Sequence, residues 1–365
     1  MFLNRLQLVD YRLQANGRLD LGASWVAFTG PNGTGKTNLL DAIHFLCLGR
    51  SYFTRQDGQL VRFGCRGFRL DGWFGPSSAL EETRVSVVYK TGAGKEMSMN
   101  EVVYPRLSEH LGRMPVVMIA PGDTVLLEGT GAERRRFVDM LLAQTHPDYV
   151  QALLKRDHLL SQRNAMLKAA RQGTALDSDL LACYDEELIR CHRAITEVRT
   201  PWVDHFGPLM KSLYRPIAGE AESAELTYVP DQASYGDGFQ KPSLQREMDA
   251  GYTLWGTQRD DWDFDLSGQS VRRYASQGQR KSYLLALKLA QCAYFLDSGK
   301  PHVTLLVDEF FEKLDQSRLQ GLVKAIQQLS GRGVQVFLSD TGKDRVQKLL
   351  DLCEQPCLII DTPIL

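Results

Sequence analysis

Residues 30 to 37 are Gly30-Pro31-Asn32-Gly33-Thr34-Gly35-Lys36-Thr37, a match to the phosphate-binding loop pattern GxxxxGK[ST]. The loop follows the apolar run 25–29 and precedes helical periodicity over 38–48, which predicts strand, loop and helix. Glycines suit such a loop because backbone N–H groups must wrap around phosphate oxygens without obstruction by side chains. We expect all eight residues to bind a nucleotide, with Lys36 bridging its β- and γ-phosphates and the Thr37 hydroxyl binding Mg²⁺. A turn that merely starts a helix is the simpler alternative.

A second motif follows the apolar run 303–307, where the chain continues with Asp308 and Glu309. A carboxylate at the carboxyl end of a buried strand can hold Mg²⁺ through its waters, as a Walker B aspartate does, and we assign this role to Asp308. Glu309 is expected to face the γ-phosphate and to orient or deprotonate the attacking water. Acids often follow strands, but the upstream phosphate loop strengthens the prediction that Glu309, Lys36 and Asp308 are catalytic.

The third motif is Ser276-Gln277-Gly278-Gln279, which opens a helix expected over 279–296. Ser-x-Gly-Gln at a helix start is typical of an ABC-type signature, in which a hydroxyl, a glycine N–H and the helix N-terminus form an anion site. An ordinary helix cap by Ser276 is the alternative. Since the phosphate loop already encloses one side of the phosphates, Ser276, Gly278 and Gln279 are expected to close over ATP held by a second copy. The motif therefore predicts an ATP-dependent homodimer, with Leu314-Asp315 at its interface.

The remaining chain predicts an α/β fold: an ABC-type P-loop ATPase head with an antiparallel β patch, split by a mainly helical arm domain. The antiparallel patch is expected between 55 and 104, and further strands over 226–229, 303–307, 334–338 and 357–360. A turn is expected at Asn16-Gly17, and a short helical hairpin, a few turns per arm, is expected to reverse at 171–174. We predict a head over 1–125 and 250–365 and an inserted arm over 126–249.

Composition excludes several classes of protein. The 365 residues are 43% hydrophobic and 24% charged, which is typical of a folded chain of about two domains. The 43 Lys and Arg nearly balance 44 Asp and Glu, so any contact with nucleic acid must come from a local patch. The seven cysteines form no CxxC pair, and charged residues interrupt the first twenty positions. We therefore expect a soluble cytoplasmic protein with reduced thiols and no membrane partner.

Together these stretches resemble the RecF family, which belongs to the SMC-like ABC-type ATPases, over nearly the full length. Besides the three motifs, the resemblance rests on 41–43, 49–51, 129–139, 162–164 and 256–261. It implies a weak, Mg²⁺-dependent and DNA-stimulated ATPase that dimerises around ATP and acts in recombinational repair. It also implies binding to gapped DNA or double-strand/single-strand junctions, and assistance to RecO and RecR in loading RecA.

The chain departs from the family's usual pattern at three places. Gln258 stands where a histidine is usual, and Glu309-Phe310-Phe311-Glu312 replaces the common Asp-Val-(Leu/Phe)-Ser. Ser339-Asp340-Thr341 stands where a threonine-rich switch is common, and either hydroxyl is expected to hydrogen-bond the γ-phosphate. These departures bear on the rate of ATP turnover more than on the fold.

Candidate DNA contacts are the arginines Arg134, Arg135 and Arg136 at the base of the arm and Arg163 along it. Other cations of the arm accompany them: Lys155, Arg156, Lys168 and Arg171. No base-reading module is evident, so little sequence preference is expected. A solvated helix face with ordinary cations is the alternative.

Two other functions fit the nucleotide motifs. One is the nucleotide-binding subunit of a membrane transporter, which the helical arm and the missing switch histidine disfavour. The other is a nucleotide-gated scaffold with negligible hydrolysis, in which Glu309→Gln would leave turnover unaffected.

Overall fold

The computed structural model describes residues 2–76, 81–232, 235, 239, 241–309, 315–353 and 357–363. The chain forms two compact units. The first comprises Met1–Thr124, Leu209–Ser223 and Ser276–Leu365, and the second comprises Val125–Pro208 and Ala224–Ala275. These bounds differ from the expected head and arm at 209–223 and 250–275, and the division into functional domains stays a prediction.

A parallel sheet forms the centre of the first unit. Its strands lie in the order β14 (Cys357–Asp361), β3 (Trp25–Thr29), β13 (Val334–Asp340), β12 (Val303–Asp308) and β8 (Val116–Ile119). Every strand of this sheet except β14 is buried along its whole length, as the continuous apolar runs of β3, β8, β12 and β13 predict. Asp308 lies opposite Ser339, and Asp340 lies opposite Thr29, so polar residues meet at the carboxyl edge of the sheet.

The second sheet of this unit is antiparallel, which confirms the predicted patch and extends it to the N-terminal strands. Its strands lie in the order β2 (Gln14–Asp20), β1 (Phe2–Tyr11), β4 (Gly67–Gly75), β5 (Thr83–Lys90), β6 (Gly94–Met99) and β7 (Val102–Val103). The expected turn at Asn16-Gly17 is wrong. Asn16 pairs with Val9 and Gly17 with Leu8, because the chain already reverses at Arg12, whose φ is 50°.

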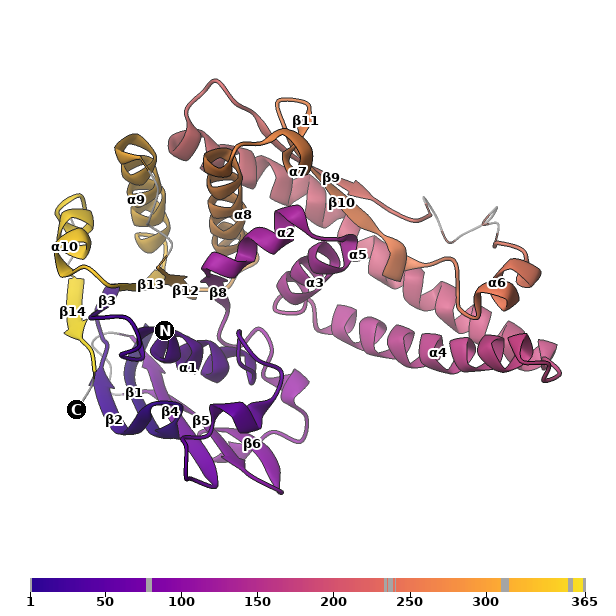
Figure 1. Cartoon of the computed structure of the whole chain (residues 1–365), viewed down its shortest axis with the longest axis horizontal. Helices are drawn as coiled ribbons and strands as arrows, with labels where there is room; N and C mark the ends of the chain where they lie inside the picture. Colours follow the sequence, from indigo (N-terminus) through magenta and orange to yellow (C-terminus); the bar gives the residue numbers. More distant parts are fainter. Residues whose placement is uncertain are drawn as a thin grey trace. The chain divides into compact units, whose positions relative to one another are not determined.

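Helices cover both faces of the parallel sheet in the first unit (Figure 1). Helix α1 (Lys36–Leu48) lies between the two sheets and contacts β4, β5, β8, β12 and β13. Helices α8 (Gln277–Asp297), α9 (Gln316–Ser330) and α10 (Lys343–Asp351) pack on the other face. The phosphate loop therefore joins a buried strand to a buried helix, so both of its ends are held in place by packing.

The second unit is mainly helical. It contains α2 (Val125–Glu128), α3 (Gly131–Leu142), α4 (Pro147–Arg171), most of α5 (Ser178–Ala218), α6 (Leu244–Ala250), α7 (Val271–Tyr274) and a sheet of β9 (Ala224–Val229), β10 (Asp261–Leu266) and β11 (Gln269–Ser270). Short 3₁₀ turns occur at Asp57–Leu60, Leu107–Glu109, Pro121–Thr124 and Thr257–Arg259 across the two units.

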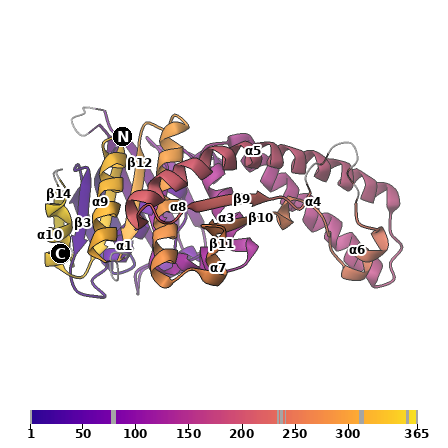
Figure 2. The same ribbon diagram turned by 90° about the horizontal axis from the view of Figure 1, so that it is seen from above.

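Helices α4 and α5 form the predicted hairpin and lie side by side (Figure 2), joined by the ion pairs Lys155–Glu187 and Arg163–Asp185. The turn at 171–174 is confirmed, but the expectation of a few turns per arm is wrong, because α4 has 25 residues and α5 has 41. α5 continues through three prolines that oppose a helix locally, because one face of it is buried at Leu188, Ile195, Trp202, Phe206 and Met210. Across the part of the chain that is described, no helix is long and apolar enough to span a bilayer.

Candidate nucleotide-binding site and signature

The phosphate loop has a backbone that only glycine adopts without strain at three positions. The φ angles are 148° at Gly30, 82° at Gly33 and 98° at Gly35. A Cβ added at Gly33 would meet nothing within 4 Å, so the strain there is conformational and not steric. Pro31, Asn32 and Gly33 are exposed at the end of β3. This conformation suits a cradle of backbone N–H groups for phosphate oxygens.

Lys36 folds back over this loop. Its Nζ donates to the carbonyl oxygens of Gly30 at 2.8 Å and Pro31 at 3.0 Å. The same ammonium lies 3.4 Å from the Glu309 Oε1, and the Lys36 side chain is only 3% exposed. The positive charge is therefore held inside the loop, where it faces an acid from the end of β12.

Two hydroxyls converge on the Asp308 carboxylate. Thr37 Oγ1 donates to its two oxygens at 3.0 and 3.1 Å, and Ser339 Oγ donates at 2.5 Å. Burial raises the pKa of Asp308 above its ordinary value, while the hydrogen bonds from Ser339 and Thr37 oppose that rise. A hydroxyl and a carboxylate at one point are the hard oxygen donors that suit Mg²⁺. The residues present therefore fit the ion that the motifs imply.

Glu309 turns away from the strand. Its φ of 43° breaks the β geometry, and its N–H is 3.2 Å from both the carbonyl oxygen and the Oγ of Ser339. This turn brings its carboxylate to Lys36, so the structure places the three predicted catalytic residues together. The expected interface residue Leu314, like Phe310, Phe311 and Glu312, lies outside the described residues. Asp315 is described and caps α9 by accepting the N–H of Arg318 at 2.9 Å.

The signature residues form a capping box at the start of α8. Ser276 Oγ accepts the N–H of Gln279 at 3.2 Å, and Gln279 Oε1 accepts the N–H of Ser276 at 2.8 Å. Gln279 also donates its side-chain amide to Glu222 at 2.7 Å. Ser276 is exposed, whereas a Cβ at Gly278 would lie 2.6 Å from Nη1 of Arg318.

The signature and the phosphate loop are separate sites within one copy. Among the described residues, no hydrogen bond or ion pair joins Ser276, Gly278 or Gln279 to residues 30–37. The capping box shows that Ser276 does cap helix α8, as the simpler alternative predicted. It leaves the helix N-terminus exposed, as an anion site requires.

The phosphate loop also contacts Thr362, which follows β14. The Thr362 N–H donates to the Thr29 carbonyl at 2.7 Å, and its hydroxyl lies 2.6 Å from that of Thr34. A Cβ at Gly30 would lie 2.5 Å from Thr362 Oγ1, so close approach as well as φ demands glycine there. No local signal predicts this contact, because it depends on β14 pairing with β3.

Asp41 belongs to the 41–43 stretch that carries part of the family resemblance. It is fully buried in α1 and accepts hydrogen bonds from Tyr11 at 3.0 Å, Arg12 at 3.1 Å and the Tyr52 N–H at 2.8 Å. Ser51 donates to the same carboxylate at 2.8 Å. Asp41 therefore ties the helix behind the phosphate loop to the β1–β2 turn and to the 49–51 stretch.

The candidate DNA contacts differ in exposure. Arg134 is buried in a bidentate pair with Asp261, at 2.7 and 2.8 Å, and Arg135 donates to the Asp260 carbonyl at 2.7 Å. Arg136 is exposed. Arg163 is 1% exposed and pairs with Asp185 at 2.7 Å and Glu247 at 2.6 Å. This burial contradicts the expectation that Arg163 contacts DNA, since its donors already face acids inside the second unit.

Comparisons with known proteins agree with this geometry. A family model described as "AAA domain" matches residues 5–145. The DNA replication and repair protein RecF of Cytophaga hutchinsonii is 31% identical over 348 residues, which are 94% of this chain and 90% of that protein. RecF of Parabacteroides distasonis is 33% identical over 352 residues, which are 96% and 94% of the two chains.

Solved structures show the same fold. "Structure of the recombination mediator protein RecF-ATPrS in RecFOR pathway" matches with a TM-score of 0.85 at 24% identity, over 100% of this chain and 98% of that one. An SMC head bound to the C-winged helix domain of ScpA matches with a TM-score of 0.58 at 13% identity, over 99% and 94%. The fold is therefore that of an SMC-like ABC-type head, and identity above 30% with curated relatives over nearly their whole length shows that this chain belongs to the RecF family of DNA replication and repair proteins.

Proposed function

We propose that this protein is a Mg²⁺-dependent ATPase that dimerises around ATP and binds gapped or junction DNA during recombinational repair. One observation carries the proposal: Lys36 meets the adjacent acids Asp308 and Glu309, which are far from it in the sequence, beside the phosphate loop at the carboxyl edge of the parallel sheet. Ligands of open α/β sheets bind at this edge.

Each residue has a distinct task in this proposal. The N–H groups of 32–35 and the Lys36 ammonium bind the phosphates, and Thr37 and Asp308 would hold Mg²⁺, which would neutralise charge on the phosphate oxygens. Glu309 orients the attacking water and accepts its proton. Its present partner is Lys36, at 3.4 Å, so the base starts within reach of the residue that grips the phosphates.

The signature supplies the second half of the site from another copy. Ser276 is exposed at the N-terminus of the 21-residue helix α8, where the helix dipole favours a phosphate. Gln279 is anchored by Glu222, which fixes the first turn of the helix before any partner arrives. We propose that Ser276, Gly278 and Gln279 close over ATP bound by the other copy.

The proposal includes DNA and protein partners. Arg136, the exposed member of the three, would contact DNA phosphates with little sequence preference, whereas Arg134 is buried against Asp261 and Arg135 donates to the Asp260 carbonyl. The solved relative is described as a recombination mediator in the RecFOR pathway, which supports RecO and RecR as partners. Assistance to RecA is what the family resemblance implies.

The test is a measurement of molecular mass with and without ATP and Mg²⁺. The wild-type protein should dimerise only with ATP and Mg²⁺. Lys36→Ala should fail to bind ATP, because it removes the phosphate-binding ammonium, whereas Ser276→Arg should bind ATP and stay monomeric. Normal dimerisation of Ser276→Arg would contradict the role assigned to the signature.

A further inference from the structure

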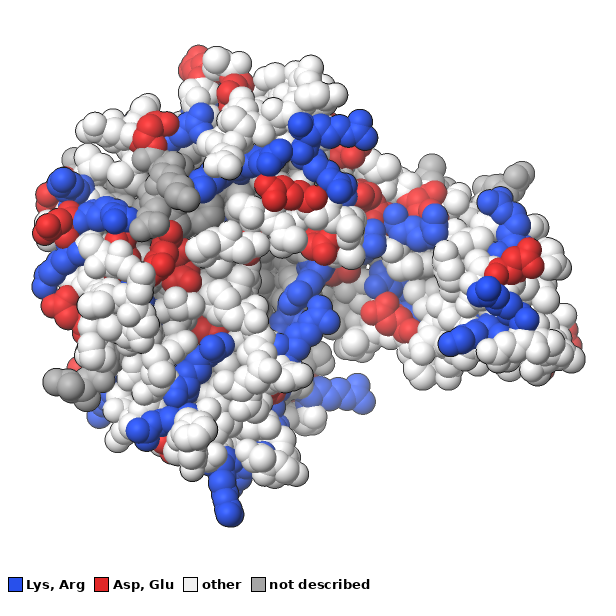
Figure 3. Space-filling view, in the orientation of Figure 1, with Lys and Arg blue, Asp and Glu red and all other residues white. Residues whose placement is uncertain are grey.

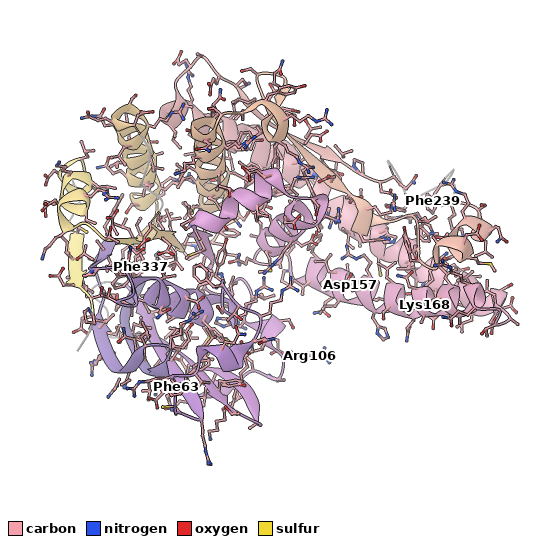
Figure 4. The ribbon with its side chains drawn as sticks, in the orientation of Figure 1. Phe63, Arg106, Asp157, Lys168, Phe239 and Phe337 are labelled. Atoms are coloured by element: carbon pink, nitrogen blue, oxygen red, sulfur yellow. The ribbon has the colours of Figure 1, made fainter. Side chains whose placement is uncertain are left out.

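The most exposed large apolar side chain described in this chain is Phe63. Its relative exposure is 103%, so its ring contacts essentially nothing else in the protein. A lone exposed apolar residue is common, but a ring held wholly in water adds no packing energy to the fold. Phe63 lies beside the antiparallel sheet of the first unit, where it is labelled in Figure 4.

The turn that carries Phe63 is firmly held. The Cys65 N–H closes it by donating to the Arg62 carbonyl at 3.0 Å, and Gly64 has the positive φ of 85° that such a turn needs. The Arg62 N–H donates to the Asp10 carbonyl at 2.8 Å, and the Arg66 carbonyl accepts from Thr91 at 2.9 Å. Both ends of the turn are therefore fixed to the sheet, and the ring is presented at little further entropic cost.

The surroundings of Phe63 are basic. Residues 50–66 contain four arginines and one acid, although the whole chain carries a net charge of −1. Arg55, Arg62 and Arg66 are exposed, and Phe53 is 44% exposed in the same segment. Asp57, the one acid of this segment, pairs with Lys95 at 2.9 Å, and Asp10 of β1 lies 3.7 Å from Arg62. In the space-filling view, basic side chains outnumber acidic ones at the end of the first unit that carries β4 to β6 (Figure 3).

We propose that this surface, Arg55, Arg62, Phe63 and Arg66, binds a single strand of nucleic acid. The Phe63 ring stacks on an unpaired base, and the arginines contact the flanking phosphates. A base in a duplex has both faces covered by its neighbours, so a protruding ring fits an unpaired base and not the interior of a helix. Arginines on both sides of an exposed aromatic ring favour an anionic, aromatic ligand over an apolar protein surface.

This inference rests on the proposed DNA-binding function and assigns to the head a contact that the arm arginines do not provide. The contact is also independent of sequence, because every base has a face on which an aromatic ring can stack. It would let the protein distinguish the single-stranded part of a gapped substrate from its duplex part.

The test is fluorescence anisotropy with a labelled oligothymidylate and with a blunt duplex. Phe63→Ala should weaken binding of oligothymidylate at least about fivefold and change duplex binding little, because it removes only the stacking contact. Phe63→Tyr, which keeps the ring, should retain affinity. Arg66→Ala should lower the slope of log affinity against log salt by about 0.7 on oligothymidylate, as expected for one lost phosphate contact.

The matched control is Val102→Ala, which shortens another exposed apolar side chain of the same sheet, 72% exposed. It should leave binding unchanged. If the wild type binds oligothymidylate and Phe63→Ala binds it equally well, the inference is wrong and the proposed function stands. If the wild type binds no DNA at all, both are wrong. A loss confined to ATP-dependent dimerisation would also overturn the inference and assign the turn to contact with a second copy.

Discussion

Arg163 illustrates how burial changes the role of a basic residue. The sequence places it among other cations on a helix, where a DNA contact is a reasonable expectation. In the fold, its guanidinium instead pairs with Asp185 and Glu247, whose side chains are 10% and 2% exposed. The Arg163 side chain itself is only 1% exposed. Thr253 also receives a hydrogen bond from it, at 2.9 Å. The residue is therefore a structural centre of the second unit.

We expect Arg163→Ala to lower the free energy of unfolding by about 3–5 kcal/mol, because it leaves two carboxylates buried without their partner. Arg136→Ala, at an exposed position of the same unit, should change the free energy of unfolding by less than about 0.5 kcal/mol. Urea denaturation followed by circular dichroism measures both. Equal stability of the two variants would show that the buried ion pairs do not form.

Glu309 can be tested by a change that keeps its shape. Glu309→Gln should reduce ATP turnover about 10²–10⁴-fold, because an amide cannot accept the proton of water. ATP binding should persist and the dimer should become long-lived. Turnover and mass are measured on the same sample, with Glu101→Gln, at an exposed position, as the control. Unchanged turnover would support a nucleotide-gated scaffold with some other source of residual hydrolysis.

At the level of elements, the C-terminal end of α5 packs among the helices of the first unit. Tyr214 lies 6.3 Å from Tyr283 of α8, between ring centroids, and donates to Glu222 at 2.5 Å. Pro216 approaches α9 so closely that a Cβ at Gly321 would lie 1.7 Å from its carbonyl oxygen. Glu222 in turn holds Gln279, so α5, α9 and the signature helix form one packed set.

We expect Gly321→Ala to destabilise the protein by about 1–3 kcal/mol, because the added methyl group must push one backbone away from another. Helix propensity alone predicts the opposite sign, a gain of about 1 kcal/mol for alanine over glycine. Thermal denaturation decides between them, and Gln320→Ala, on the exposed face of α9, should have a small effect. A stabilised Gly321→Ala variant would show that α5 and α9 are not in contact.

At the level of the whole molecule, buried histidines make stability depend on pH. Burial lowers the pKa of His44 and of His110 from 6.5 to about 4, and that of His192 to about 3. A histidine that must stay neutral in the fold but protonates when unfolded contributes stability above pH 6.5. That stability is lost as the pH falls from 6.5 towards the folded pKa.

Each of these histidines should therefore cost about 2 kcal/mol of unfolding free energy between pH 7 and pH 5. Urea denaturation at the two pH values measures the sum. His44→Gln should reduce the loss by about one histidine's share, whereas His158→Gln, at an exposed position, should lose as much stability as the wild type. An identical pH dependence of His44→Gln and wild type would contradict burial of a neutral imidazole.

The sequence determined what depends on adjacent residues. The apolar run of β3, the glycines of the phosphate loop and the periodicity of α1 encode strand, loop and helix locally, and the same holds for the runs of β12 and β13. Spacing alone therefore predicted the α/β head, the antiparallel patch and the residues around Lys36. The prediction of a turn at Asn16-Gly17 was wrong because pairing of this stretch with β1 overrode the local preference of Asn-Gly for a turn.

Only the tertiary structure decided contacts between residues distant in the chain. It joins Lys36 to Glu309, the phosphate loop to Thr362 and the signature to Glu222, and it buries Arg163 among acids while leaving Phe63 in water. The physical reason is that burial and pairing are properties of what surrounds a side chain. A residue's type sets the interactions that it can make, and the packed fold sets which of them it does make.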